Sequence, residues 1–364
     1  MRLAPLCQHR ARASHDMLRR PPVRQGSAVR EAAATAKPAA SASPLPQPLH
    51  VLYAVALLLA ALAYRPTLEE RHSAAAAPEA AFDTARASAV MVELCRLGSR
   101  PAGSAAAESA RRLLRKEVES IASIAAASGA SLEVETVRAS GAFYTDFLDG
   151  FTNVYHNASS LVARLSWPGS RPEAVLLNAH YDSFPGSPGG SDNAVNVGAA
   201  LGAVRALAAG PALPVSVLLL LNGGEESNWV AAHAFATGGH SWAADYRVVL
   251  NLEAIGAGGE AVIFQLGPDA PWLADALRRA QHTPRGSVLG HEIFQIPQFP
   301  AGTDLKTLLV HAPHGDVAGT DGERPVGIDP AILGLTLTLT LTLTLTLTLT
   351  LTLTLYALYP IPLS

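Results

Sequence analysis

Cysteine is nearly absent from this sequence of 364 residues, which contains only Cys7 and Cys95. The two lie on opposite sides of the apolar segment described below, and we expect no intrachain disulfide bond between them. The chain also has no large excess of positive or negative charge, since its formal net charge is -3. Bulk charge therefore gives no support for nucleic-acid binding. The length is sufficient for one catalytic domain with additional segments around it.

Charge is unevenly distributed along the chain, and the N-terminal segment is basic. Residues 1–48 contain Arg and Lys at many positions but only two acidic residues, Asp16 and Glu31. The same segment is rich in alanine, proline and serine. Because this composition offers little apolar surface to bury, we predict that residues 1–48 form a disordered basic tail in the cytosol.

The sequence also lacks an apolar run of full membrane length. Residues 49–64 carry no formal charge, but the run falls just below the lower limit of about 17 residues for a membrane-spanning helix. We favour a short transmembrane anchor here, because the basic tail would hold its own side in the cytosol. A cleaved signal peptide and a buried core helix are the alternatives. With an anchor, residues 65–81 form a linker, and the following domain lies in the lumen or outside the cell.

Strand-like apolar runs alternate with helical segments through the centre of the chain. This order favours an α/β fold in which helices cover a mostly parallel, mixed sheet. Strands are predicted at residues 132–137, 160–165, 174–179, 214–221, 247–252 and 261–265. Helices are predicted at residues 82–97, 105–127, 194–209, 228–238 and 271–281. Residues 183–191, rich in glycine and proline, are expected to form a loop.

Acidic side chains and one histidine occur where three of the predicted strands end. The clusters are His180-Tyr181-Asp182, Ser191-Asp192-Asn193, Gly223-Gly224-Glu225-Glu226 and Asn251-Leu252-Glu253. Polar groups at the ends of buried parallel strands are where α/β proteins build their sites. Imidazole and carboxylate groups, without a thiolate, suit a hydrolytic zinc ion. The sequence therefore predicts a zinc site at these strand ends.

The first two clusters suggest different parts in such a site. Asp182 follows His180 by two positions, so the two side chains share a face if the strand continues. It is therefore placed to orient the imidazole rather than to bind metal itself. Asp192 ends the glycine-rich loop, and its two oxygens can bridge two cations. A helix cap is the simpler explanation for Asp192 when it is considered alone.

The other two clusters supply carboxylates. Of the adjacent residues Glu225 and Glu226, one can bind metal while the other accepts a proton from the attacking water. Glu253 ends the next strand and can bind a second metal ion. Taken singly, these acids are better explained as surface charge. The four clusters together, at the ends of three strands and of the loop between them, favour the metal site over those separate explanations.

The segments that carry these clusters resemble the zinc exopeptidase family of leucyl-type aminopeptidases, glutamate carboxypeptidases and glutaminyl cyclases. The resemblance runs from about residue 82 to about residue 333. Its motifs are LGSRPAGS, LLNAHYDSFPGSPGGSDNAV, LLLLNGGEESNW, Thr303-Asp304 and Gly327-Ile328-Asp329. It implies that residues 82–333 are a zinc peptidase domain that hydrolyses peptide bonds with metal-activated water. Its substrates would be peptides or proteins, cleaved from a free terminus.

The resemblance also implies a role for each residue of the clusters. The implied metal ligands are His180 and Glu226 for one zinc ion, Glu253 for the other, and Asp192 as a bridge. The implied catalytic residues are Glu225, as general base, and Asp182, which orients the imidazole. In this family the bond that corresponds to Asp192–Asn193 is often a cis peptide.

One feature of the family is missing. Its members supply a last histidine to the second zinc ion, on a loop after the strand that corresponds to residues 327–333. No histidine follows His314 in this sequence, and Leu335 to Leu355 is an unbroken Leu-Thr alternation. We interpret residues 334–364 as a low-complexity tail, which leaves the peptidase domain C-terminally incomplete. An inactive, non-catalytic product and a glutaminyl-cyclase-like acyltransferase with a single zinc ion are the alternatives to a peptidase.

The cellular location rests on two further observations. Asn157-Ala158-Ser159 is an N-glycosylation sequon, which has meaning only in the secretory pathway. The resemblance to membrane-anchored members of the family implies the endoplasmic reticulum membrane. We therefore expect a single-pass protein whose catalytic domain lies in the lumen.

Overall fold

The computed structural model describes most of the central part of the chain. The described residues are 82–145, 150–254, 262–267, 285–296, 301–312 and 333–338, with Val55, Leu273 and Phe299. The chain divides into two compact units, Met1–Pro66 and Thr67–Ser364, and the sheet lies in the second. Several predicted segments lie wholly or mostly outside the described residues: the basic tail 1–48, the anchor 49–64 except Val55, the linker 65–81 and most of helix 271–281. Within the described residues, no helix has the length and apolar character needed to cross a membrane.

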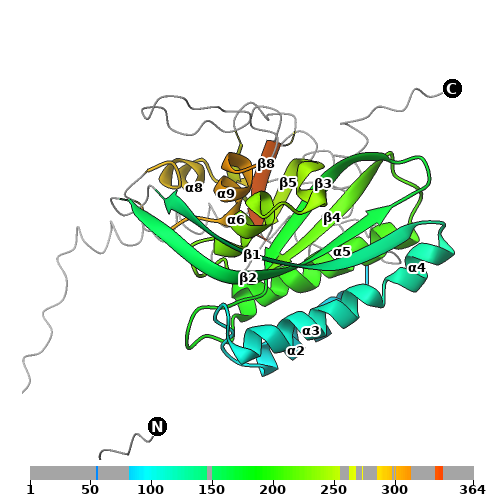
Figure 1. Ribbon diagram of the computed structural model, residues 1–364, viewed down its shortest axis with the longest axis horizontal. Coiled ribbons are helices and arrows are strands. Elements are labelled where there is room, and N and C mark those ends of the chain that lie inside the picture. Colours follow the sequence, from blue (N-terminus) through cyan, green and yellow to red (C-terminus); the bar gives the residue numbers. More distant parts are fainter. Residues whose placement is uncertain are drawn as a thin grey trace, which may run out of the picture. The chain divides into compact units, whose positions relative to one another are not determined.

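The described strands form one mixed sheet of eight (Figure 1). They are β1 (Ser131–Thr145), β2 (Phe151–Ser166), β3 (Arg171–His180), β4 (Val215–Asn222), β5 (Tyr246–Leu252), β6 (Val262–Leu266), β7 (Arg285–Gly286) and β8 (Leu333–Thr338). Their order is β1-β2-β4-β3-β5-β8-β6-β7. Strands β4, β3, β5 and β8 run parallel to one another, whereas β1, β2 and β6 make antiparallel pairs. The predicted mixed sheet flanked by helices is therefore confirmed.

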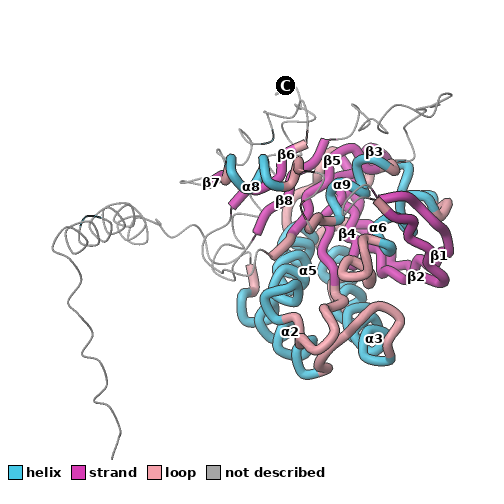
Figure 2. Tube along the Cα trace, turned by 90° about the vertical axis from the view of Figure 1, so that its left-hand side faces the viewer, coloured by secondary structure: helices cyan, strands magenta, loops and turns pink. Residues whose placement is uncertain are grey.

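Helices cover both faces of the sheet (Figures 1 and 2). One face carries α2 (Thr84–Arg96), α3 (Ala105–Glu119), α4 (Ala122–Ala127) and α5 (Val195–Ala209); the other carries α6 (Val230–Thr237) and α9 (Asp304–Val310). Alternate residues of β3 divide between these layers: Val175 and Leu177 belong to the first core, and Leu176 belongs to the second. Because side chains alternate along a strand, an apolar run such as β3 can be buried on both faces.

Several predicted boundaries differ from the structure. The first two strands are longer than the predicted strands 132–137 and 160–165, because β1 continues to Thr145 and β2 begins at Phe151. The single helix expected at residues 105–127 is interrupted between α3 and α4, where the Ser120 hydroxyl donates to Glu117 O at 2.6 Å. A serine that bonds to the backbone competes with the helical hydrogen bonds, and the alanine-rich sequence on both sides hides this break. In addition, β8 includes the first residues of the Leu-Thr alternation and pairs with both β5 and β6. Part of the predicted tail therefore belongs to the sheet.

The strand register brings the sequence clusters to one end of the sheet. His180 of β3 is opposite Asn222 of β4, and Asn178 of β3 is opposite Asn251 of β5. Continuing the second register by two residues places Glu253 beside His180. The carboxyl ends of β3, β4 and β5 consequently deliver their polar residues to the same place, as expected for parallel strands.

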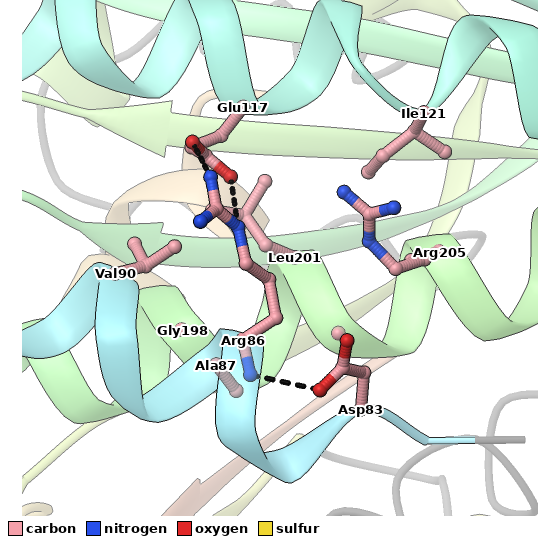
Figure 3. Close-up of a pocket in the computed structure, with 10 residues that line it drawn as sticks. Asp83, Arg86, Ala87, Val90, Glu117, Ile121, Gly198, Leu201 and Arg205 are labelled. Carbon is pink, nitrogen blue, oxygen red and sulfur yellow. Dashed lines mark hydrogen bonds and ion pairs between the residues drawn. The ribbon is translucent and has the colours of Figure 1, made fainter. Parts of the chain in front are cut away.

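Helices α2, α3 and α5 pack closely on the first face (Figure 3). Arg86 of α2 is paired with Glu117 of α3, with Nε 2.9 Å from Oε2. Beneath this pair, a Cβ atom at Gly198 of α5 would lie only 2.4 Å from the carbonyl oxygen of Ala87 in α2. The missing side chain therefore allows the two helix backbones to approach, and α5 is in turn the helix that follows the loop bearing Asp192.

Replacing Gly198 by valine should lower the free energy of unfolding by about 3 kcal/mol. The new side chain would meet backbone atoms of α2, which cannot shift unless the helix moves with them. Thermal unfolding of the purified chain measures this change. Gly286→Val is the matched control, since a Cβ there meets its nearest atom at 3.8 Å. Equal melting temperatures for the two variants would contradict the close approach of α2 and α5.

Candidate active site

His180 is the centre of the candidate site. It is the last residue of β3, it is completely buried, and carboxylates lie at both of its ring nitrogens. Nε2 is 3.0 Å from Asp192 Oδ1, 3.2 Å from Glu253 Oε1 and 3.9 Å from Glu225 Oε2. Residues from all four sequence clusters therefore meet at this nitrogen atom.

Asp182 lies on the other side of the imidazole. Its Oδ1 is 3.3 Å from His180 Nδ1, and its main-chain oxygen is 3.2 Å from the same atom. The same carboxylate accepts the backbone N–H groups of Glu225 and Glu226, each at 3.2 Å. Asp182 is fully buried and so joins the end of β3 to the loop that follows β4. This is the position that the predicted orienting role requires.

His180, Asp192 and Glu253 form a set with metal-binding geometry. One ligand atom from each of these residues lies within 4.8 Å of the others. Two of their buried oxygens, Asp192 Oδ1 and Glu253 Oε2, have no hydrogen-bond donor among the described residues. A buried carboxylate oxygen without a donor is unfavourable unless a cation faces it. One imidazole nitrogen and two carboxylates also suit zinc chemically, so the residues present fit this ion.

The loop before α5 positions Asp192 for this contact. The Asp192–Asn193 peptide bond is cis, as the family resemblance implies. The Asn193 amide donates to the Leu252 carbonyl oxygen at 2.8 Å, which ties the loop to the end of β5. The side chain of Asp192 remains half exposed, at 49%, although its Oδ1 is buried. One oxygen thus faces the imidazole while the side chain stays accessible from outside.

Glu226 is not part of this set. Its Oε1 accepts the backbone N–H of Phe184 at 2.8 Å, on the loop that follows β3. The assignment of His180 and Glu226 to one zinc ion, with Glu253 at the other, stays a prediction, and in the structure Glu253 Oε1 lies 3.2 Å from His180 Nε2. The parallel pairing of β3 with β5 places Glu253, rather than Glu226, beside the imidazole.

Glu225 faces the imidazole with one oxygen and Trp229 with the other. Oε2 is the atom 3.9 Å from His180 Nε2, and Oε1 accepts the indole N–H of Trp229 at 2.9 Å. The side chain is largely buried, with 12% exposed. A carboxylate in this position can accept a proton from a water molecule held close to the metal ligands.

The charges in the site shift its protonation equilibria strongly. Burial opposes protonation of His180, but the charge of Glu253 and the contacts with Asp182 and Asp192 raise its pKa well above the ordinary value. Burial, followed by the charge of Glu253, raises the pKa of Glu225 well above its usual range. Burial and the charge of Asp192 raise the pKa of Glu226 to about 7. Glu225 and Glu226 therefore lose their protons less readily than exposed glutamates.

A buried amide network beneath the site was not foreseen from the sequence. Asp304, fully buried at the start of α9, accepts the side-chain amides of Asn178 at 3.0 Å and Asn222 at 2.5 Å. Asn178 also donates to Asn251 Oδ1 at 2.6 Å. Burial raises the pKa of Asp304 to about 7. The available signal was a single asparagine near the end of each of three otherwise apolar strands, and Asp304 had been noted only as part of a family motif.

Arg100 is a second residue whose place the sequence did not reveal. Its guanidinium is fully buried and donates to the carbonyl oxygens of Tyr181 at 2.9 Å and Pro188 at 2.7 Å, as well as to those of Leu94 and Gly98. It therefore fixes the loop between Asp182 and Asp192 against the end of α2. The motif LGSRPAGS contained this residue, but nothing in its spacing indicated these partners.

Four other histidines of the described residues have partners outside the metal-binding set. His233 Nδ1 is 2.7 Å from the Tyr155 hydroxyl, His240 Nε2 is 3.1 Å from Glu135, and the ring of His311 lies edge-on to His233. His291 Nδ1 is 3.5 Å from the Leu266 backbone nitrogen. None of the four belongs to the metal-binding set found in the described residues.

Comparison with known proteins gives consistent matches. Residues 160–321 match the model of peptidase family M28. The chain is 37% identical over 243 residues to endoplasmic reticulum metallopeptidase 1 of Rattus norvegicus, which covers 66% of this chain and 26% of that protein. The Homo sapiens protein of the same name is 39% identical over 191 residues, covering 52% of this chain and 21% of that protein. The chain thus spans about a quarter of the length of these relatives.

Two solved structures share the fold. The LapA aminopeptidase of Legionella pneumophila has a TM-score of 0.52 at 12% identity, over 76% of this chain and 72% of that one. BSAP, a zinc aminopeptidase from Bacillus subtilis, has a TM-score of 0.51 at 10% identity, over 76% of this chain and 95% of that one. The family match at residues 160–321 contains every predicted metal ligand and both predicted catalytic residues. This part of the chain is therefore similar in sequence to peptidase family M28.

Proposed function

We propose that this chain is a zinc-dependent metallopeptidase that removes residues from a free end of peptides or proteins. The observation that carries the proposal is the buried set of His180, Asp192 and Glu253, with the Glu225 carboxylate on the same imidazole nitrogen. The names of the relatives and the aminopeptidase structures support the same reaction class.

The metal ligands would divide around Asp192. His180 and Glu253 would hold one zinc ion from one side of this carboxylate. Glu226 would help to hold a second ion with Asp192; burial and then the charge of Asp192 raise the pKa of Glu226 to about 7. A bound zinc ion would supply a Lewis acid that activates water and polarises the peptide carbonyl.

Glu225 would move the proton in this reaction. Its raised pKa and low exposure suit a group that takes a proton from water and returns it to the departing amine. Asp182 would hold His180 through Nδ1, which leaves Nε2 free to bind metal. Asp182 would also fix the backbone of Glu225 and Glu226, so one carboxylate positions both sides of the site.

The cellular setting forms part of the proposal. Residues 49–64 would anchor the chain in the endoplasmic reticulum membrane with the peptidase domain in the lumen. The names of the endoplasmic reticulum relatives and of a vacuolar membrane protease from Candida tropicalis support a membrane location. Asn157 is exposed on β2, where the pairing with β1 is interrupted, and would be accessible to glycosylation.

Glu225→Gln should lower kcat at least about 100-fold while zinc content stays that of the unchanged chain, because a base is removed and no ligand is lost. Asp192→Asn should instead lower the bound zinc. Peptide turnover measures kcat, and elemental analysis of the same samples measures bound zinc. Peptides with one or both termini blocked test whether a free terminus is needed. Glu133→Gln makes the same chemical change at an exposed position and should have no effect. Normal turnover in Glu225→Gln would assign the base to another residue.

Zinc affinity should rise with pH between about 6 and 8. The pKa of Glu226 is raised to about 7, and that of His180 is also raised, so both must lose a proton before they bind metal. Zinc therefore binds less tightly as pH falls through these values. Chelator competition at several pH values measures the slope, and Glu226→Gln should make it shallower. An affinity that does not change with pH would contradict the proposed ligands.

Expression in cells with a secretory pathway should yield a glycosylated chain. Asn157→Gln should then migrate faster on a denaturing gel by the mass of one N-linked glycan, whereas Ser159→Thr keeps the sequon and should migrate unchanged. Glycosidase treatment of the unchanged chain should reproduce the faster band. Identical migration of all three proteins before treatment would place the domain outside the lumen.

A further inference from the structure

Trp229 makes a direct contact with the proposed catalytic base. Its indole N–H donates to Glu225 Oε1 at 2.9 Å, and its backbone N–H donates to the Glu225 carbonyl oxygen at 2.9 Å. The tryptophan is therefore bonded to the same glutamate through both its side chain and its main chain. It stands just before α6 as the N-cap residue of that helix.

The backbone before α6 has an unusual conformation that directs this side chain. Asn228 and Trp229 both have a φ of 61°, in the left-handed region that bulky residues seldom adopt. Two consecutive residues in this region turn the chain sharply between the glutamate pair and α6. The turn brings the indole ring back toward Glu225, four residues earlier in the sequence.

The indole ring fits a slot that requires glycine on its other side. A Cβ atom at Gly302 would lie 2.3 Å from Trp229 Cζ2 and 2.7 Å from its Cη2. Gly302 precedes Thr303, which caps α9 and donates from its hydroxyl to Gln265 Oε1 at 2.6 Å. These two hydrogen bonds hold Thr303 in place. The backbone of Gly302 beside it is therefore restrained, and it limits the movement of the indole ring.

The contact determines which oxygen of Glu225 faces the metal ligands. A carboxylate can present either oxygen by rotation of its terminal bond. With Oε1 bonded to the indole, Oε2 is left 3.9 Å from His180 Nε2. The indole nitrogen is a donor only, so it neither accepts a proton from water nor competes for the metal. The indole therefore fixes the orientation of the Glu225 carboxylate but cannot itself act as the base.

We propose that Trp229 is a positioning residue that holds the Glu225 carboxylate with one oxygen directed at the metal-binding set. This inference rests on the proposed role of Glu225 as the base, and it goes beyond that role by naming the group that orients it. The contact itself can be tested without any activity measurement.

The first test uses nitrogen NMR of the full chain labelled at its four tryptophans. The spectrum of Trp229→Phe identifies the indole signal of Trp229 by its absence. In Glu225→Ala this signal should move toward the position of an indole without a charged acceptor, while the other indole signals stay in place. An unmoved signal would overturn the contact, whatever the enzyme does.

The second test uses kinetics of the zinc-loaded chain. Trp229→Phe keeps a ring in the slot and removes the N–H, so kcat should fall about tenfold, as for loss of one hydrogen bond to a charged group. KM and zinc content should remain within about twofold, since no substrate or metal contact is lost. The matched control is Trp167→Phe, because the buried Trp167 indole N–H has no hydrogen-bond partner within the described structure. This control should retain its kcat.

Gly302→Ala provides an independent variant in which the indole N–H is kept but its slot is filled. It should lower kcat with zinc retained, and it should shift the Trp229 indole signal as Glu225→Ala does. Unchanged kcat in Trp229→Phe, or zinc loss in step with activity, would overturn a positioning role. If the unchanged zinc-loaded chain cleaves no peptide, the proposed function fails, and the NMR signal still decides whether Trp229 holds Glu225.

Discussion

The concentration of negative charge around His180 is the constraint on which the rest of the structure depends. The carboxylates of Asp182, Asp192, Glu225 and Glu253 converge on one buried imidazole. Burial and mutual repulsion both disfavour ionised acids in such a place, and a positive charge is needed to offset them. Against the effect of burial, the charge of Glu253 and the contacts with Asp182 and Asp192 raise the pKa of His180 well above its ordinary value, which favours a proton on the imidazole. A divalent cation would supply more positive charge and would displace the proton.

The surroundings hold these acids mostly with neutral groups. Backbone N–H groups bond to Asp182, an indole bonds to Glu225, and asparagine amides bond to Asp304 beneath the site. Arg100 is a buried cation beside the loop between Asp182 and Asp192. Its guanidinium donates to backbone carbonyl oxygens rather than to the carboxylates. The negative charge of the site is therefore left available for metal, while the geometry is fixed by hydrogen bonds.

The sheet includes the first residues of the Leu-Thr alternation, which composition alone would classify as low-complexity sequence. Strand β8 begins the Leu-Thr alternation and lies between β5 and β6, paired with both. Without it, β5 would have unpaired backbone groups along one side in the described sheet, next to the strand that carries Glu253. Alternation with a period of two suits a strand, so a low-complexity segment can still complete the ladder at its start. Low complexity in the sequence therefore does not exclude a place in the sheet for the first residues of this segment.

The sequence by itself determined the alternation of strands and helices, the mixed sheet, and the clusters at the ends of β3, β4 and β5. These features follow from local patterns: apolar runs, glycine-rich loops and polar residues directly after them. Only the tertiary structure decided that Glu253, rather than Glu226, stands beside His180, because that choice depends on which strands are neighbours and in which register. The same holds for Asp304, Arg100 and Trp229. Their partners are fixed by contacts between distant segments or by a rare backbone turn, and no spacing in the sequence carries that information.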